Sequence, residues 1–93
     1  MTAMTLRIEK SAHGENLFLR LIGQIQAQHL EGLKAEMESQ GPGAALDLQE
    51  VTLVDVDVVR FLGGCEARGT QLLHCPPYIR EWILREARGA RLS

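Results

Sequence analysis

Two carboxylates stand two residues apart where an apolar run meets the start of a helical pattern. They are Asp55 and Asp57, and they follow the apolar residues 51–54. A pair of carboxylates can act as general acid and base when the surroundings raise the pKa of one of them. Here both would lie at the positive end of the next helix, which favours the ionised form of each. The pattern therefore favours an N-cap role for Asp55 and a helix-dipole role for Asp57 over catalysis.

The other residues that could carry chemistry form no complete set. Cys65, His74 and Cys75 are soft metal ligands near one another in sequence, but a structural zinc site needs four ligands. His13 and His29 have no acid or nucleophile beside them, and we interpret both as solvated. The sequence has neither a phosphate-binding loop of the Walker type nor a GxGxxG motif. It therefore predicts no catalytic residue, no metal site and no cofactor, and an enzyme is the least favoured class.

Short periodic segments must position these residues. Alternating apolar and polar residues predict strands at 6–10 and 17–22, which a turn at 12–16 joins into an antiparallel hairpin. Gly23 is expected to end the second strand. Apolar residues at helical spacing then predict an amphipathic helix that stops at Gly-Pro-Gly 41–43. The residues on its inner face are Ala27, Leu30, Leu33 and Met37.

The second half of the chain alternates strands and helices. A short strand at 44–48 and the apolar run 51–54 precede a helix with apolar residues at i, i+3, i+4 and i+7. These residues are Val58, Phe61, Leu62 and Cys65. Arg68 and Gly69 are expected to close this helix, and Gly63-Gly64 indicates close packing within it. A strand at 70–74 follows, and Pro77 is expected to begin a last helix that ends near residue 88, before a frayed tail at 89–93.

The order of these elements is β-β-α-β-α-β-α. It predicts an α/β fold with a mixed, roughly four-stranded sheet and about three helices packed beside it. The 93 residues, 45% of them apolar, suit one domain over residues 1–93. Ten Lys and Arg against twelve Asp and Glu give a net charge of −2, which supplies no global basic field for nucleic acid.

Targeting signals and cysteine usage indicate the compartment. No apolar run approaches the roughly 20 residues that span a bilayer, and the N-terminus lacks the pattern of a signal peptide. The two cysteines are therefore expected to be reduced thiols. These features predict a cytoplasmic protein with no membrane insertion.

Residues 44–85 resemble a known family. The order of segments there is similar to that of a STAS domain. It comprises a Leu-Asp-Leu strand at 46–48, the segment 51–55, an apolar helix that ends in Ala-Arg-Gly at 67–69, and a strand at 71–74. STAS domains occur as anti-sigma factor antagonists and at the C-termini of sulphate transporters. The resemblance extends over the whole chain and is strongest over residues 44–85. It implies a curved four-stranded mixed sheet with helices beside it, which agrees with the order of elements above.

The resemblance departs from the family at the junction between strand and helix. In members that act as phosphoswitches this junction reads Asp, Ser, Ser or Thr, Gly. A partner kinase that is also the anti-sigma factor phosphorylates the second hydroxyl. This chain reads Asp55-Val56-Asp57-Val58. Asp57 occupies the phosphoacceptor position and has no hydroxyl to esterify, so it places a permanent charge of −1 there, against about −1.5 to −2 for phosphate.

The same helix predicts a surface for a partner. Asp57, Arg60, Gly64 and Arg68 share the face opposite the predicted core positions. Asp57 and Arg60, at i and i+3, are expected to pair. Because the resemblance implies that partners dock beside the junction, we predict a partner-binding surface there. Its residues are Asp55, Val56, Asp57, Arg60 and Gly64.

Three functions remain open on the sequence. The first is a non-catalytic regulatory module that binds a protein such as an anti-sigma factor or a kinase-like protein. The alternatives are a cytoplasmic STAS accessory subunit of an ABC transporter and a STAS domain that binds a small ligand or nucleotide. Two copies of the chain could also form a homodimer through the strand 6–10 or through the face around Trp82.

Overall fold

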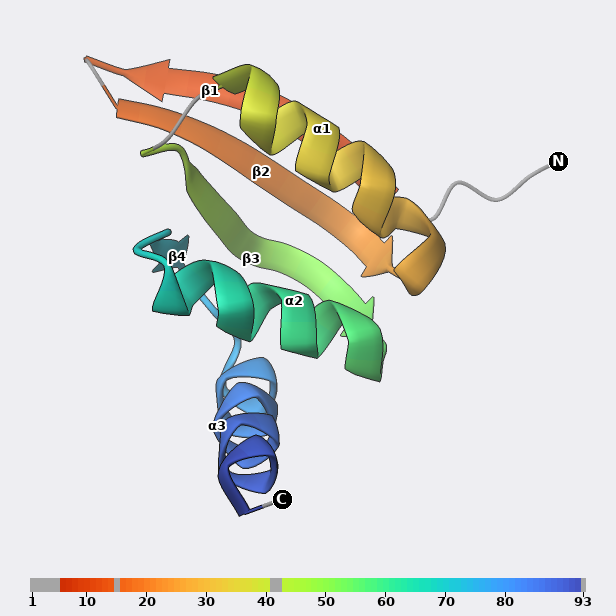
Figure 1. The fold of residues 1–93 in the computed structure, drawn as a ribbon. Coiled ribbons are helices and arrows are strands. Elements are labelled where there is room, and N and C mark those ends of the chain that lie inside the picture. Colours follow the sequence, from red (N-terminus) through yellow and green to blue (C-terminus); the bar gives the residue numbers. More distant parts are fainter. Residues whose placement is uncertain (1–5, 15, 41–42, 93) are drawn as a thin grey trace, which may run out of the picture.

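One mixed sheet of four strands forms the centre of the protein (Figure 1). The structure is a computed structural model that describes residues 6–14, 16–40 and 43–92. The strands are β1 (Leu6–His13), β2 (Asn16–Ile25), β3 (Ala45–Val54) and β4 (Leu72–Leu73), in the order β1-β2-β3-β4. β1 and β2 are antiparallel, whereas β3 runs parallel to both of its neighbours.

Helices follow β2, β3 and β4. A 3-10 helix, η1 (Ala27–His29), leads into α1 (Leu30–Gln40), while α2 (Val56–Ala67) follows β3 and α3 (Pro77–Leu92) follows β4. The mixed sheet, the three α-helices and the element order confirm the predicted fold class. Figure 1 shows α1 along β1 and β2, α2 along β3, and α3 beyond α2. No helix in the described part of the chain is long and apolar enough to cross a membrane.

The core lies between one face of the sheet and the helices. Alternate residues of a strand point to the same side, so β2 and β3 each present a row of leucines to the helices. Leu19, Leu21, Leu46 and Leu48 are fully buried in this way. The helices close the core with Leu33 of α1, Val58, Val59, Leu62 and Cys65 of α2, and Ile79 and Ile83 of α3. Burying each such aliphatic side chain stabilises the fold by roughly 1.5–3 kcal/mol.

The strand boundaries correct several predictions. Gly23 does not end β2, which continues to Ile25. Gly23 has a φ of 96°, a conformation that glycine adopts readily, and the register with β3 shifts beside it. The glycine therefore makes an irregularity within the strand. β1 extends beyond residue 10 to His13, β4 is only two residues long, and β3 joins the predicted strand 44–48 and the run 51–54 into one.

The helix boundaries agree with the sequence in part. α2 ends before Arg68 and α3 begins at Pro77, as predicted. Ala27, expected on the inner face of the first helix, is instead exposed in η1. α1 ends at Gln40, and the predicted stop at 41–42 lies outside the described residues. The tail predicted to be frayed is helical through residue 92, and residue 93 lies outside the described part.

Candidate functional site

Asp55 caps α2 and also holds the start of η1. Its Oδ1 accepts a hydrogen bond from the backbone N–H of Val58 at 3.0 Å, which confirms the predicted N-cap. Its Oδ2 accepts a second bond from the backbone N–H of Ala27 at 2.9 Å. Both carboxylate oxygens are thus engaged with backbone groups. Asp55 therefore fixes the geometry of the predicted surface, and its neighbours present the groups that a partner could contact.

The next two residues form the outer start of α2. Val56 is half-buried, whereas Asp57 is exposed in the first turn. Among the described residues, no hydrogen bond or ion pair engages the side chain of Asp57. This carboxylate lies near the positive end of the helix dipole, and its charge is available to a partner.

Arg60 does not pair with Asp57, which corrects the expected i, i+3 pair. Its Nε instead donates a hydrogen bond to Oε1 of Glu86 in α3, at 2.9 Å. An exposed ion pair of this kind contributes between about 0 and 1 kcal/mol to stability. Its main consequence here is positional, because it draws the guanidinium toward α3 and away from the start of α2.

The two adjacent glycines of α2 have different surroundings. A Cβ on Gly63 would lie 3.3 Å from Cγ2 of Ile83, so α3 approaches the α2 backbone closely at this point. The predicted role of a glycine in close helix packing is therefore confirmed at Gly63. A Cβ on Gly64 would have Nη1 of Arg68 as its nearest neighbour, at 3.8 Å. This is an ordinary van der Waals distance to a flexible side chain, so no close contact requires a glycine at position 64.

Two hollows flank α2. One lies between α1 and α2 and has a volume of about 370 Å³, and the other lies between α2 and α3 and has a volume of about 390 Å³. Arg60 and Gly64 line both hollows, so these two residues form the ridge that separates them. The second hollow is lined mainly by small and aliphatic groups, including Gly63, Ala67 and the exposed Leu84.

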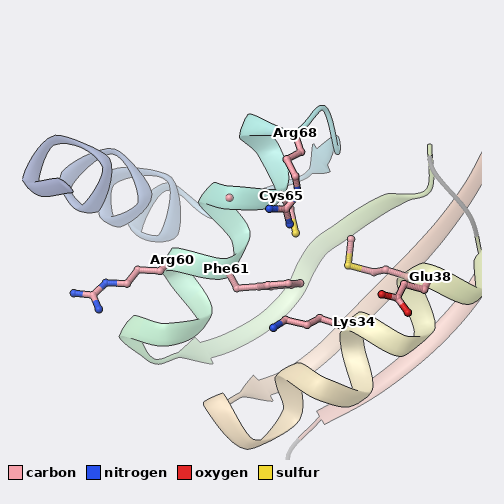
Figure 2. A pocket seen from close by; sticks show the side chains of 8 residues that line it. Lys34, Glu38, Arg60, Phe61, Cys65 and Arg68 are labelled. Carbon is pink, nitrogen blue, oxygen red and sulfur yellow. The ribbon is translucent and has the colours of Figure 1, made fainter. Parts of the chain in front are cut away.

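The α1–α2 hollow combines an apolar floor with charged side chains. Phe61, predicted to be a core residue, is only half-buried, and in Figure 2 its ring reaches from α2 toward α1. The ammonium group of Lys34 lies 5.7 Å from the centre of that ring, within the range of a cation–π interaction. Burial raises the pKa of the Cys65 thiol, and the charge of Arg68 opposes part of that effect. Figure 2 also shows Arg60 pointing away from this hollow.

Sequence reasoning missed a polar cluster around Asp47. This residue is only 9% exposed, and its Oδ1 accepts a hydrogen bond from the backbone N–H of Gln49 at 3.0 Å. The same oxygen lies 3.2 Å from Nδ1 of His74, and Oδ2 lies 4.0 Å from Nε of Arg20. His74 lies in the turn between β4 and α3 and has a positive φ of 53°, which is uncommon for a residue other than glycine. Arg20 and Asp47 are paired positions on β2 and β3, and knowledge of this pairing would reveal the polar cluster. Sequence periodicity alone does not give the pairing.

The remaining histidine and cysteine predictions have mixed outcomes. His29, expected to be solvated, is half-buried, and its Nδ1 accepts a hydrogen bond from the backbone N–H of Gln26 at 3.0 Å. The side chain of His13 lies outside the described part of the structure. Cys65 is buried and Cys75 is half-buried. In residues 6–14, 16–40 and 43–92, no group of three His, Cys, Asp or Glu side chains is placed to hold a metal ion.

Comparison with known proteins gives no family assignment, since no family model and no curated protein matches the chain. The resemblance to STAS domains therefore rests on the residues of this chain.

Proposed function

We propose that the protein is a non-catalytic interaction module of the STAS type, which binds a regulatory protein in the cytoplasm through the outer side of α2. The observation that carries this proposal is that the carboxylate of Asp57 is free to meet a partner. Its carboxylate is exposed in the first turn of α2 and is engaged by no other described residue. By resemblance, this is the position at which STAS phosphoswitches carry their regulated charge.

The surroundings of Asp57 support a macromolecular partner. Val56 adds an apolar group beside the charge, and the ridge formed by Arg60 and Gly64 has a hollow on each side. Protein interfaces typically combine an apolar centre with a polar rim and complementary relief. The outer side of α2, formed by Val56, Asp57, Arg60 and Gly64, combines apolar groups, charge and relief. Its hollows extend to the neighbouring helices α1 and α3.

A fixed carboxylate has a consequence for regulation. A serine gains negative charge when a kinase phosphorylates it and loses that charge when a phosphatase removes the phosphate. Asp57 instead keeps a single negative charge. We expect a partner such as an anti-sigma factor or a kinase-like protein to bind in a single state that phosphorylation at this junction does not alter. A kinase-like partner would then act as a binding protein toward this chain.

The test begins with cross-linking and affinity purification of the tagged full chain from its native cells. The affinity of the purified partner is then measured by calorimetry for the wild type, Asp57→Arg and Val56→Glu. We expect each variant to weaken binding by about tenfold or more, since it reverses a charge or adds one at the contact. Glu81→Arg, an equal charge reversal at an exposed site on α3, is the matched control and should bind like the wild type.

The outcomes separate the surface from the partner class. Unchanged affinity in both Asp57→Arg and Val56→Glu would show that the partner binds elsewhere, and the proposed surface would be wrong. Capture of the ATPase of an ABC transporter, with affinity lost in both variants, would keep the surface and replace the regulatory partner with a transporter subunit.

A further inference from the structure

Lys34 and Arg68 are two cations at the α1–α2 hollow that have no carboxylate partner. No described acidic side chain lies within 4.0 Å of either one, whereas five other Lys or Arg side chains each have such a neighbour. Those five are Arg7, Lys10, Arg20, Arg60 and Arg80. Glu38 is the acidic residue among the described residues that line the hollow, and it forms no ion pair with Lys34 or Arg68. With Arg60 held by Glu86, the hollow carries a net positive charge.

An apolar floor lies between these two cations. It is formed by Phe61 and Cys65 of α2 and by Met37 of α1. In Figure 2 the Phe61 ring projects into the space between the helices, with Lys34 on one side and Cys65 and Arg68 on the other. An occupant of the hollow would therefore meet an aromatic ring and a thioether first, and a positive charge at either end.

We infer that this hollow receives an Asp or Glu side chain of a protein partner, together with an adjacent apolar side chain that packs on Phe61. The inference rests on the proposed function and specifies the chemistry of the partner segment. The heads of Lys34 and Arg68 are exposed, and exposed ion pairs contribute little by themselves. A small free anion would gain little here, whereas a protein segment adds apolar contact on Phe61 and further contact along α2.

The charges of Asp57 and Arg68 also indicate which way the partner segment runs along α2. Asp57 lies in the first turn of α2 and Arg68 is the C-cap residue that follows the helix. The two are eleven residues apart, which corresponds to about 16 Å along a helix. A partner that places its acidic residue against Lys34 and Arg68 can place a basic residue against Asp57. These two partner residues would be separated by about five positions in an extended segment or about eleven in a helical one.

The test uses peptide display on the full chain. A random library of about 16 residues, long enough for a helical pair eleven positions apart, is selected on the immobilised wild type. It is selected in parallel on the double variant Lys34→Glu/Arg68→Glu. The matched control is Arg85→Glu/Arg88→Glu, which reverses two exposed cations of α3. Circular dichroism and amide NMR spectra check that every variant is folded, and Lys34→Gln/Arg68→Gln serves as a milder second variant.

We expect the wild type and the control to enrich peptides with Asp or Glu beside an aromatic or aliphatic residue. The double reversal should enrich Lys or Arg at that place instead. A peptide selected on the wild type should lose about tenfold or more in affinity on Lys34→Glu/Arg68→Glu, lose less on the Gln variant, and keep its affinity on the control. Its amide shift changes should centre on residues 34, 61, 64 and 68.

Several results would overturn the inference. They are the absence of acidic enrichment, equal selection on wild type and double reversal, and amide shifts centred away from the hollow. A native partner that requires Asp57 but binds Lys34→Glu/Arg68→Glu normally would also overturn it, while the proposed function would stand. Conversely, acidic peptides that bind the hollow, with a partner that ignores Asp57 and Val56, would support the hollow and contradict the proposed surface.

Discussion

At the scale of single residues, Asp55 connects two parts of the chain that are far apart in sequence. One oxygen accepts from Val58 at the start of α2, and the other accepts from Ala27 at the start of η1. Because an aspartate side chain is short and stiff, the two backbone segments are held close to each other. The outer start of α2, where Val56 and Asp57 lie, is thereby fixed relative to the helix pair η1–α1. A partner that binds there would meet a preorganised surface, which reduces the entropy cost of binding.

Substitutions of Asp55 should separate its two hydrogen bonds. Asp55→Ala removes both, and we expect it to lower the free energy of unfolding by about 1–2 kcal/mol, the range for loss of a helix cap. Asp55→Asn can still accept from Val58 but cannot accept with its NH₂ group from Ala27, so it should cost about half as much. Asp57→Asn is the control and should change stability by less than about 0.5 kcal/mol. Urea denaturation measures all three, and an Asn variant as stable as the wild type would contradict the role of the bond from Ala27.

The difference between the two bonds of Asp55 also shows what sequence can predict at this scale. The bond to Val58 spans three residues, so local helix rules suffice to predict it. The bond to Ala27 depends on how β2 and β3 pair, and no local rule contains that information. The same holds for the buried Asp47, whose contacts with Arg20 and His74 arise from neighbouring strands. Arg60 likewise has a local candidate, Asp57, but pairs with the more distant Glu86.

At the scale of elements, the contact between α2 and α3 depends on Gly63. An added methyl group there would meet Cγ2 of the buried Ile83 at 3.3 Å, whereas one on Gly64 meets only the flexible end of Arg68. Alanine favours a helix over glycine by about 1 kcal/mol. We therefore expect Gly64→Ala to raise the free energy of unfolding by about 0.5–1 kcal/mol. Gly63→Ala should give no gain or a net loss, and thermal unfolding of the two variants side by side checks the difference.

The irregularity in β2 makes a second comparison of glycines informative. Gly23 has a φ of 96° within the strand, where an L side chain is strained, so Gly23→Ala should lower stability by about 1–2 kcal/mol. Gly32 lies within α1 with open space around it, and the same substitution there should raise stability by about 0.5–1 kcal/mol. Denaturant titration of both variants measures the two signs. A neutral or stabilising Gly23→Ala would mean that this residue does not need its left-handed conformation.

The sequence predicts an element correctly where a helical repeat of apolar residues continues over several turns. It predicts strand ends wrongly where pairing between strands overrides the local preference of a residue. Val58, Leu62 and Cys65 recur at helical spacing, and the burial of all three follows the prediction. The sequence predicts that Gly23 ends a strand, yet pairing with β3 carries β2 two residues further. Residues 49–50 carry polar side chains that resemble a break, but they occupy exposed positions within β3. Strand pairing, which is long-range, decided both cases.

At the scale of the whole molecule, the protein is two layers thick. Its shortest dimension is 23 Å, which accommodates one sheet and one layer of helices at a spacing of about 10 Å. In the helix layer, α2 has α1 on one side and α3 on the other, and this placement creates the two hollows. A partner seated on the outer side of α2, as proposed, would therefore contact three helices at once. Substitutions on α1 or α3 can change its affinity without altering the start of α2.

The molecule as a whole should lose stability at alkaline pH. Burial raises the pKa of the thiols of Cys65 and Cys75 and of the phenol of Tyr78. Each group thus holds its proton more tightly in the folded chain than in the unfolded one. Unfolding then releases protons once the pH exceeds the ordinary pKa, which is about 8.5 for cysteine and about 10 for tyrosine. The favourable contribution is complete below those values, so the free energy of unfolding should fall as the pH rises beyond them.

Urea titrations between about pH 7 and pH 11 measure this dependence. The double variant Cys75→Ala/Tyr78→Phe removes two of the three groups and leaves the buried Cys65 in place. It also removes the hydrogen bond from the Tyr78 hydroxyl to the backbone carbonyl of Thr52, at 2.9 Å, so its stability at neutral pH will be lower. The comparison therefore concerns the slope and not the absolute value. We expect the variant to have a shallower slope above about pH 8.5 than the wild type, and parallel curves would show that these two groups do not cause the alkaline loss.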